Sequence, residues 1–114
     1  MNIDSFLEKL NQTPQEITFA ETITVIEENY NFSPTAFENG LLHNAAGENS
    51  GSCKIFAFAE LQKLSEEATL SCFGAYYYDD VLKNPEGTNH QNIRNFMKTG
   101  WDGIAFYGSP LELK

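Results

Sequence analysis

The sequence has 114 residues, a length that fits one domain and leaves little room for a second core. Hydrophobic residues make up 41% of it, and nine Phe and five Tyr can build a core without disulfides or metals, which argues against disorder. Sixteen acidic and seven basic residues give a net charge of −9, which repels phosphate backbones and anionic lipid headgroups. Neither nucleic acid nor a membrane surface is therefore an expected partner.

The first third of the chain predicts two helices. Apolar residues recur at helical spacing from Ile3 to Leu10, which predicts a three-turn helix near the start of the sequence. Residues 13–16 and 18–21 begin with Thr and end with Glu, the Thr-x-x-Glu signature of a helix start. We assign a single turn to the first signature and a full helix, ending near Tyr30, to the second.

The middle of the chain contains an extended, an irregular and an apolar stretch. Pro34 disfavours helical conformation in the residue before it, and residues 35–37 then form a short β-like run. Residues 41–52 are small and polar, which makes them the longest irregular stretch and the best candidate for a functional loop. Residues 53–64 are apolar on most sides of a helix, so we expect them to form the central buried helix.

The last third predicts two further helices and a strand. Ser65 is the expected cap of a helix that continues to about Lys83. Residues 88–91 resemble a third capping box, and the helix that they open ends at Gly100, a residue suited to a left-handed helix stop. Residues 104–107 have the composition of a strand.

These elements define a fold class. Four to five helices and two short strands, residues 35–37 and 104–107, predict a mostly helical α+β fold with a small two-stranded β element. No internal repeat divides the sequence. We therefore expect residues 1–114 to form a single compact domain.

The cysteines and the start of the sequence bear on the compartment. Cys53 and Cys72 are too few for a disulfide framework and lie in apolar helical patterns, so reduced thiols are expected, and a single bridge between them stays open. Residues 1–4 lack the basic start of a secretory signal, and no apolar run reaches the roughly 18 residues of a membrane span. We expect a protein that is cytoplasmic when made.

The strongest local candidate for a binding site is the glycine-rich turn at residues 47–54, which leads into a helix. Free amides at a helix start, the helix dipole and the lysine at position 54 together suit an anion. The spacing of the glycines and the lysine is not that of a Walker loop. The alternative is an ordinary loop in which Ser50 or Ser52 caps the helix. The candidate binding residues here are Asn44, Glu48, Asn49, Ser52 and Lys54.

Cys53 raises the hypothesis of a thiol enzyme. The helix dipole and Lys54 would favour its thiolate, and His90 or His43 would supply the base. Free cysteine is nevertheless among the residue types that are most often buried. We therefore predict a buried, unreactive Cys53 and favour a binding protein over an enzyme.

A second candidate region lies near the C-terminal end. His90, Arg94 and Lys98 recur every four residues beside Trp101, which places a cationic cluster and an aromatic ring on one ridge of a helix. The alternative is a solvated outer face whose charges balance nearby carboxylates. These residues are candidates for contacts with a negatively charged ligand.

The three consecutive tyrosines at residues 76–78 cover most of a helix's circumference, so at least one of them points outward or into a cleft. We include Tyr77 among the candidate binding residues, because exposed tyrosines suit a binding face. The histidines, Glu48 and Cys53 lack the spacing that preorganises a metal site. Neither a metal nor another cofactor is expected.

Four ordered strings carry a family resemblance. Residues 30–40, 44–58, 73–77 and 87–101, read together, closely resemble the HopJ type III effector family, and the similarity extends over most of the chain. Tyr78 departs from the family pattern, in which a basic residue is expected. The resemblance implies an effector of undefined biochemical activity that is exported by a type III apparatus into a host cell. It carries over no catalytic residue.

Three functional hypotheses follow. The resemblance implies a HopJ-like interaction protein that acts on an unidentified protein target. The glycine-rich turn favours a cytoplasmic protein that binds a small molecule or anion at residues 47–54, with Arg94 and Lys98 as charge partners. The third hypothesis is a thiol enzyme with Cys53 as nucleophile and His90 as base.

Overall fold

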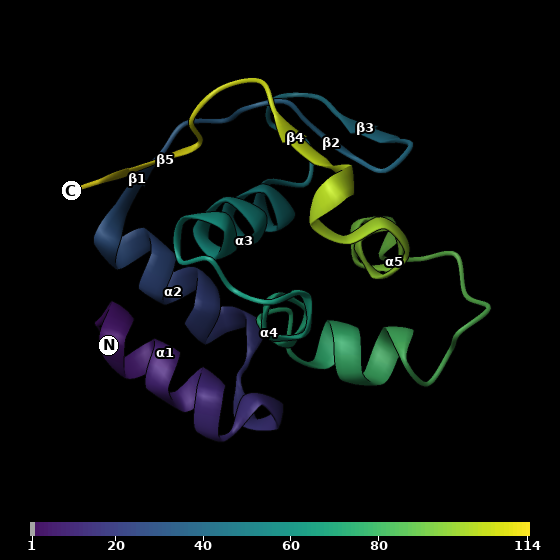
Figure 1. Ribbon diagram of the computed structural model, residues 1–114, viewed down its shortest axis with the longest axis horizontal. Helices are drawn as coiled ribbons and strands as arrows, with labels where there is room; N and C mark the ends of the chain where they lie inside the picture. The colour runs from purple at the N-terminus through teal and green to yellow at the C-terminus, as the bar shows by residue number, and fades with distance from the viewer. Residues whose placement is uncertain (1) are drawn as a thin grey trace.

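A central helix surrounded by the other elements organises the computed structural model, which describes residues 2–114 (Figure 1). The α-helices are α1 (Ile3–Gln12), α2 (Phe19–Asn29), α3 (Ser50–Leu61), α4 (Glu66–Ser71) and α5 (Gln91–Thr99). Short helical segments of other types are η1 (Pro14–Glu16), η2 (Tyr76–Val81) and η3 (Gly100–Gly103). The strands are β1 (Tyr30–Phe32), β2 (Phe37–Asn39), β3 (Leu42–Asn44), β4 (Ile104–Phe106) and β5 (Leu111–Leu113).

Three of the α-helices begin with the side-chain caps that local sequence favours. The Asn2 side chain accepts a hydrogen bond from the Ser5 amide at the start of α1. Thr18 opens α2 with the reciprocal bonds of a capping box, and Ser65 accepts from the first turn of α4. The capping predictions at residues 18–21 and at Ser65 are therefore confirmed.

The helix predicted from Ser65 to about Lys83 is interrupted, and this prediction was wrong. Helix α4 ends at Ser71, Gly74 adopts a left-handed conformation with φ of +60°, and the π-helix η2 begins at Tyr76. A Cβ atom on Gly74 would lie 2.8 Å from the backbone nitrogen of Phe19. The break follows because α4 packs against the start of α2 so closely that only glycine fits.

The strands form two small antiparallel sheets. One has the order β3-β2-β4, in which Phe37 lies opposite both Asn44 and Phe106. The other pairs β1 with β5, so that Tyr30 lies opposite Leu113. The predicted α+β class is confirmed, and β4 lies within the strand predicted at residues 104–107. Its partner β2 begins at Phe37, the last residue of the strand predicted at 35–37, so that strand lies two residues later than expected. The β part is larger than expected, because three additional strands of three residues each were not predicted.

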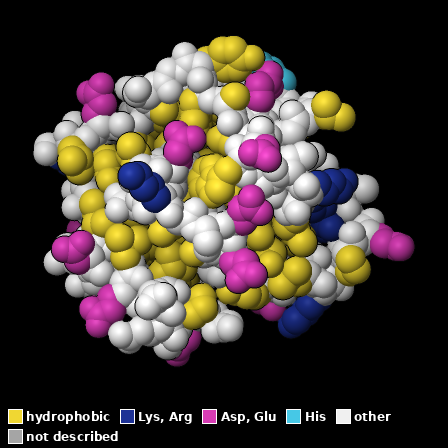
Figure 2. Space-filling model, in the orientation of Figure 1, with side chains coloured by type: hydrophobic (Ala, Val, Ile, Leu, Met, Phe, Trp, Pro, Cys, Tyr) yellow, Lys and Arg dark blue, Asp and Glu magenta, His cyan; other side chains and the backbone are white. Residues whose placement is uncertain are grey.

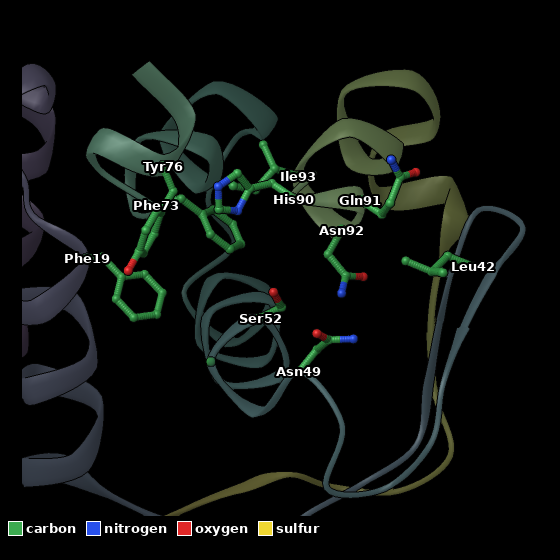
Figure 3. Close-up of a pocket in the computed structure, with 11 residues that line it drawn as sticks. Phe19, Leu42, Asn49, Ser52, Phe73, Tyr76, His90, Gln91, Asn92 and Ile93 are labelled. Atoms are coloured by element: carbon green, nitrogen blue, oxygen red, sulfur yellow. The ribbon is translucent and has the colours of Figure 1, made fainter. Parts of the chain in front are cut away.

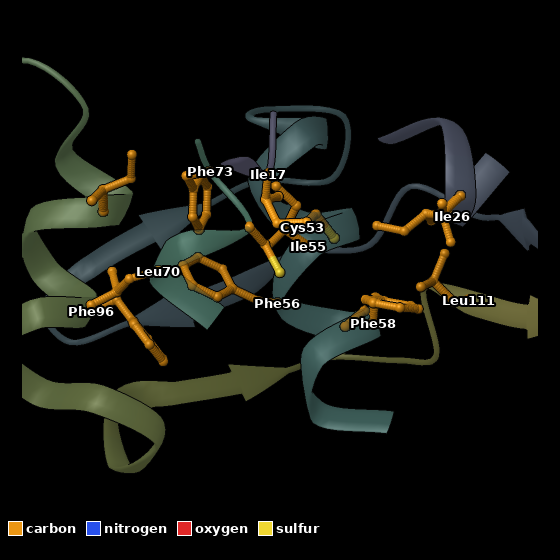
Figure 4. Close-up of a cluster of buried hydrophobic side chains, with 14 of the residues drawn as sticks. Ile17, Ile26, Cys53, Ile55, Phe56, Phe58, Leu70, Phe73, Phe96 and Leu111 are labelled. Atoms are coloured by element: carbon orange, nitrogen blue, oxygen red, sulfur yellow. The ribbon is translucent and has the colours of Figure 1, made fainter. Parts of the chain in front are cut away.

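Helix α3 supplies the centre of the core. Its side chains at Ile55, Phe56 and Phe58 have no exposed surface, as expected for a helix that is apolar on most sides. The Phe56 ring contacts the rings of Phe37 and Phe96, which come from a strand and from another helix. Figure 4 shows these side chains within one continuous apolar cluster. The prediction of a central buried helix is confirmed, with its start three residues earlier than expected.

The domain is flattened, with principal extents of 36 × 32 × 21 Å. Across residues 2–114, none of the helices combines the length and the apolar character that a membrane span requires.

Candidate functional site

Helices α3 and α5 begin without a side-chain cap. Their N-cap residues, Asn49 and His90, both have left-handed backbone conformations, with φ of 50° and 51°. Asn and His tolerate this conformation better than most residues. Neither side chain accepts a hydrogen bond from the helix that it precedes. The two helix starts thus differ from those of α1, α2 and α4.

The capping box predicted at residues 88–91 was wrong, and the alternative of a Ser50 or Ser52 cap for α3 does not hold either. Neither Ser50 nor Ser52 caps α3, since both lie inside the helix. At α5 the Gln91 side chain donates a hydrogen bond of 2.6 Å to the backbone carbonyl of Thr88, so the expected capping box is absent. In both cases the left-handed N-cap turns the chain before the expected residue can reach the amides.

The missing caps leave backbone donors unsatisfied. In α3 the first amide bonded along the helix is that of Cys53, which donates to the Asn49 carbonyl over 3.0 Å. In α5 the corresponding amide is that of Arg94, which donates to the His90 carbonyl over 3.1 Å. Residues 50–52 and 91–93 therefore present amides without an acceptor in the helix.

Both helix starts line the same cavity, whose volume is about 490 Å³. In Figure 3, Asn49 before α3, Ser52 of α3 and Asn92 of α5 lie around the same space, with Phe19 and Leu42 on opposite sides. No Asp or Glu belongs to the lining. The lining residues are Phe19, Leu42, Asn49, Gly51, Ser52, Phe73, Tyr76, His90, Gln91, Asn92 and Ile93.

A buried network of asparagines holds the two helix starts together. The Asn44 side-chain oxygen accepts hydrogen bonds from Asn49 at 2.7 Å and from Asn92 at 3.0 Å. The Asn92 side-chain oxygen in turn accepts from Asn39 and Asn44. Since Asn39 and Asn44 belong to β2 and β3, the small sheet fixes the distance between α3 and α5. Asn39 Oδ1 is buried and has no hydrogen-bond partner within the described residues.

An aromatic wall closes one side of the cavity. The Tyr76 ring lies 5.0 Å from the Phe19 ring and 5.1 Å from the His90 ring. His90 Nε2 also lies 3.0 Å from Asp80 Oδ2, outside the cavity lining. Tyr76 is 42% exposed. It is therefore the outward-pointing tyrosine that the run of three predicted. A flat apolar group entering the cavity would meet these rings first.

The Lys54 side chain does not lie at the free amides of α3, where the sequence analysis predicted it. Its ammonium lies 3.5 Å from Glu27 Oε2 and 4.9 Å from the centre of the Phe32 ring. Lys54 does not line the cavity. Its side chain packs on α2 and therefore cannot also reach the free amides at the start of α3. The prediction that it partners an anion there was wrong.

Arg94 likewise does not line the cavity between α3 and α5. Its side chain is 8% exposed and donates hydrogen bonds to the carbonyls of Asn89 at 2.6 Å and Asn84 at 2.9 Å. The guanidinium therefore holds the segment before α5 in place, and Arg94 and Lys98 both line a different cavity, of about 540 Å³. Within the predicted ridge of positive charge, Arg94 therefore has a structural role and Lys98 is exposed at the surface.

Cys53 is buried, as the sequence analysis predicted. It is 1% exposed, and its sulfur lies 3.6 Å from the carbonyl oxygen of Thr35, among the apolar side chains shown in Figure 4. Burial raises the pKa of the Cys53 thiol despite opposing effects of the Thr35 hydrogen bond and Lys54. Burial also raises the pKa of Cys72 to about 12, and both cysteines are free thiols.

These positions do not support the thiol-enzyme hypothesis. His90 lines the cavity, whereas Cys53 does not. A nucleophilic cysteine requires an accessible thiolate, and the raised pKa and the burial both oppose one.

We expect both thiols to resist alkylation in the folded protein. In a Cys72→Ala variant, Cys53 should react with iodoacetamide at pH 7 at least about tenfold more slowly than free cysteine, because labelling requires local opening. The Cys53→Ala variant gives the matching rate for Cys72. Labelling in urea supplies the fully accessible reference, and a native rate as fast as that reference would contradict the burial of Cys53.

The remaining candidates have structural contacts. The Glu48 carboxylate accepts a hydrogen bond of 2.8 Å from the Ala45 amide and closes the loop before α3. The Trp101 indole donates to the Leu64 carbonyl over 3.0 Å and packs against Phe96. Tyr77 is partly buried and lines a second cavity.

Sequence reasoning missed several residues of the first cavity. Phe19, Tyr76 and Asn92 line the cavity but were not among the candidate binding residues, because nothing local indicates that they converge. The one usable signal was that Asn49 and His90 precede helices and belong to residue types that tolerate positive φ. Among residues 2–114, no group of three or more His, Cys, Asp or Glu side chains is arranged to hold a metal ion.

The fold and the cavity define a small α+β domain in which two uncapped helix starts meet beside an aromatic wall. Residues 3–111 match the family described as HopJ type III effector protein, and the chain belongs to that family. It is also similar to a solved structure described as "Crystal structure of unknown function protein VPA0580", with 55% sequence identity and a TM-score of 0.99. That similarity covers 100% of this chain and 95% of the other. None of the curated proteins compared with the chain matches it.

Proposed function

We propose that the protein binds a small organic anion in the cavity between the starts of α3 and α5. The observation that carries this proposal is that two uncapped helix starts line one cavity that is also walled by aromatic rings. A hollow of several hundred cubic ångströms in which apolar rings and convergent polar groups meet is typical of small-molecule sites.

Electrostatics favours an anionic group at the polar end. Each helix start carries about half a positive charge, and the backbone amides of residues 50–52 and 91–93 are available as donors. The lining contains no carboxylate, and Asp80 lies behind His90. The net charge of −9 opposes binding only weakly here, because charges beyond about 8 Å are screened at physiological salt.

The remainder of the cavity favours an apolar, flat body on the ligand. Phe19, Phe73 and Tyr76 contribute rings, and the volume of about 490 Å³ fits a molecule of small-metabolite size. An aryl or alkyl group would lie against these rings while its carboxylate or phosphate met the amides.

The test compares phenyl phosphate, benzoate and inorganic phosphate with chloride at equal ionic strength. A ligand that binds only the folded state stabilises it by about 2.7 kcal/mol at 100 times its dissociation constant, which raises the melting temperature by several degrees. We expect the largest rise with phenyl phosphate. No rise beyond the chloride control with any of the three would contradict the proposal.

A matched pair of variants locates the effect. In Ser52→Asp a carboxylate occupies the first turn of α3 and competes for the free amides, so ligand stabilisation should be lost. Ser52→Asn has a similar size without the charge and should retain most of the stabilisation. Equal responses of the two variants would place the ligand elsewhere.

Family membership supports a second proposal, that the chain is delivered by a type III secretion apparatus and acts inside a host cell. A reporter enzyme fused after Lys114 tests it directly. Secretion by bacteria with an intact apparatus, and its loss when the apparatus is inactivated, is the expected result. Equal secretion in both strains would contradict it.

A further inference from the structure

A second cavity, of about 480 Å³, lies between α1, α4 and η2 and shares no residue with the first. Its apolar side consists of Leu7 and Leu10 from α1 and of Leu64 and Ala68 at α4. Tyr77 and Tyr78 also line it. Apolar walls of this kind accommodate the aliphatic stem of a long side chain.

The two tyrosines form a fixed aromatic corner in this cavity. Their ring centres lie 5.0 Å apart, and the ring planes are inclined by 55°. The Ser71 hydroxyl donates to the Glu67 carbonyl, so in its 2.7 Å contact with Tyr78 it accepts the tyrosine proton. Tyr78 is thereby held in place.

The charged side chain of the cavity lining is a carboxylate. The Glu67 carboxylate lines the cavity and has no ion-pair partner among the described residues. It is close enough to Tyr77 to contribute, with burial and Tyr78, to a raised tyrosine pKa. Asn11 and Gln15, whose side-chain amides can both donate and accept, are also in the lining, and the lining contains no Lys or Arg.

The cavity continues into a neighbouring hollow that extends over η1 and η2. The two share Gln15 and Tyr78, and the second hollow, of about 720 Å³, adds the carboxylates of Glu16 and Asp79. Its one lysine, Lys83, lies 3.0 Å from Asp79 Oδ1. Figure 2 shows acidic side chains scattered among apolar ones on one face of the molecule. The groove is thus extended, aromatic and acidic.

We propose that this groove, which we call the Tyr77–Tyr78 groove, binds a segment of a partner protein that presents arginine side chains. A guanidinium group carries five donors, stacks on aromatic rings and pairs with carboxylates in a planar geometry. The rings of Tyr77 and Tyr78 would stack on the guanidinium, and the Glu67 carboxylate would accept its hydrogen bonds and pair with its charge. The leucines would pack against the aliphatic stem of the arginine. The extension to Glu16 indicates a peptide with more than one basic residue. The net charge of −9 would steer such a partner toward the protein.

The test uses acetyl-Arg-Leu-Gly-Arg-amide titrated into isotopically labelled full-length protein and followed by amide chemical shifts. The expected shifts are confined to the residues of the Tyr77–Tyr78 groove. The same peptide with citrulline in place of arginine retains shape and loses charge, and we expect it to bind at least tenfold more weakly. A lysine version should also bind more weakly, because an ammonium lacks the planar fork.

Two variants identify the acidic partner. Glu67→Gln should weaken binding of the arginine peptide at least tenfold, whereas Glu86→Gln, at a carboxylate that lines a different cavity, should leave it unchanged. Equal binding to the citrulline or lysine peptide, equal losses in the two variants, shifts outside the groove, or no binding at millimolar peptide would each overturn the proposal. Because Ser52 lines neither of the two hollows that make up the groove, Ser52→Asp should bind the arginine peptide normally whether or not the anion proposal holds.

Discussion

Replacement of Phe56 by Ala is expected to lower the free energy of unfolding by about 3 to 5 kcal/mol. The Phe56 ring has no exposed surface and lies 4.9 Å from the Phe96 ring and 5.4 Å from the Phe73 ring. These partners come from α5 and from the turn after α4, so the substitution opens a cavity where three parts of the chain meet. Domains of this size are stable by only about 5 to 15 kcal/mol, and the loss is a large fraction of that.

Urea unfolding followed by circular dichroism measures this effect. Leu61→Ala is the matched control, because Leu61 lies on the same helix and is 53% exposed. We expect the control to lose less than about 1 kcal/mol. If Phe56→Ala is already unfolded without urea, Phe56→Leu provides a smaller loss of about 1 to 2 kcal/mol. Equal losses for Phe56→Ala and Leu61→Ala would contradict the central position of this ring.

Replacement of Asn92 by Ala is expected to cost about 2 to 3 kcal/mol and to remove anion binding. The Asn44 side-chain amide would lose its acceptor, and the Asn44 oxygen would lose one of two donors. Both groups are buried, so water cannot readily replace the lost bonds. Because the asparagine network also holds the starts of α3 and α5 together, the two sets of free amides should no longer converge.

Asn95→Ala is the control for this variant, since the Asn95 side chain donates only to the Gln91 carbonyl of its own helix. Urea unfolding measures stability, and the phenyl phosphate shift measures binding. An Asn92→Ala variant as stable as Asn95→Ala would show that the network contributes little. A destabilised Asn92→Ala variant with an unchanged phenyl phosphate response would show that it does not position the anion site.

Most helices were predictable, because their signals are local. The Thr18–Glu21 capping box and the Ser65 cap satisfy amides three residues away. Such short residue patterns can be recognised without knowledge of the fold. Residues 53–64 were recognisable as the core helix from their composition alone. The family resemblance likewise depended only on residue order, and the family match over residues 3–111 confirms it.

The strands were harder to predict, because their signals are not local. Strand β1, at residues 30–32, pairs with β5, at residues 111–113, so its partner is far away in the sequence. In addition, three residues are too few to show the alternation that marks a strand. The break at Gly74 depends on the backbone of Phe19, more than fifty residues earlier in the sequence.

The sequence by itself determined the fold class, the family, the central helix and the burial of Cys53, since all of these follow from composition, short-range periodicity or ordered motifs. Only the tertiary structure decided the candidate site. Lys54 and Arg94 lie in the right segments, but their side chains turn to Glu27 and to the Asn84 and Asn89 carbonyls. Side-chain direction is set by what packs against each helix face, and the convergence of two helix starts is set by hydrogen bonds between distant asparagines. Neither property is encoded in local residue order.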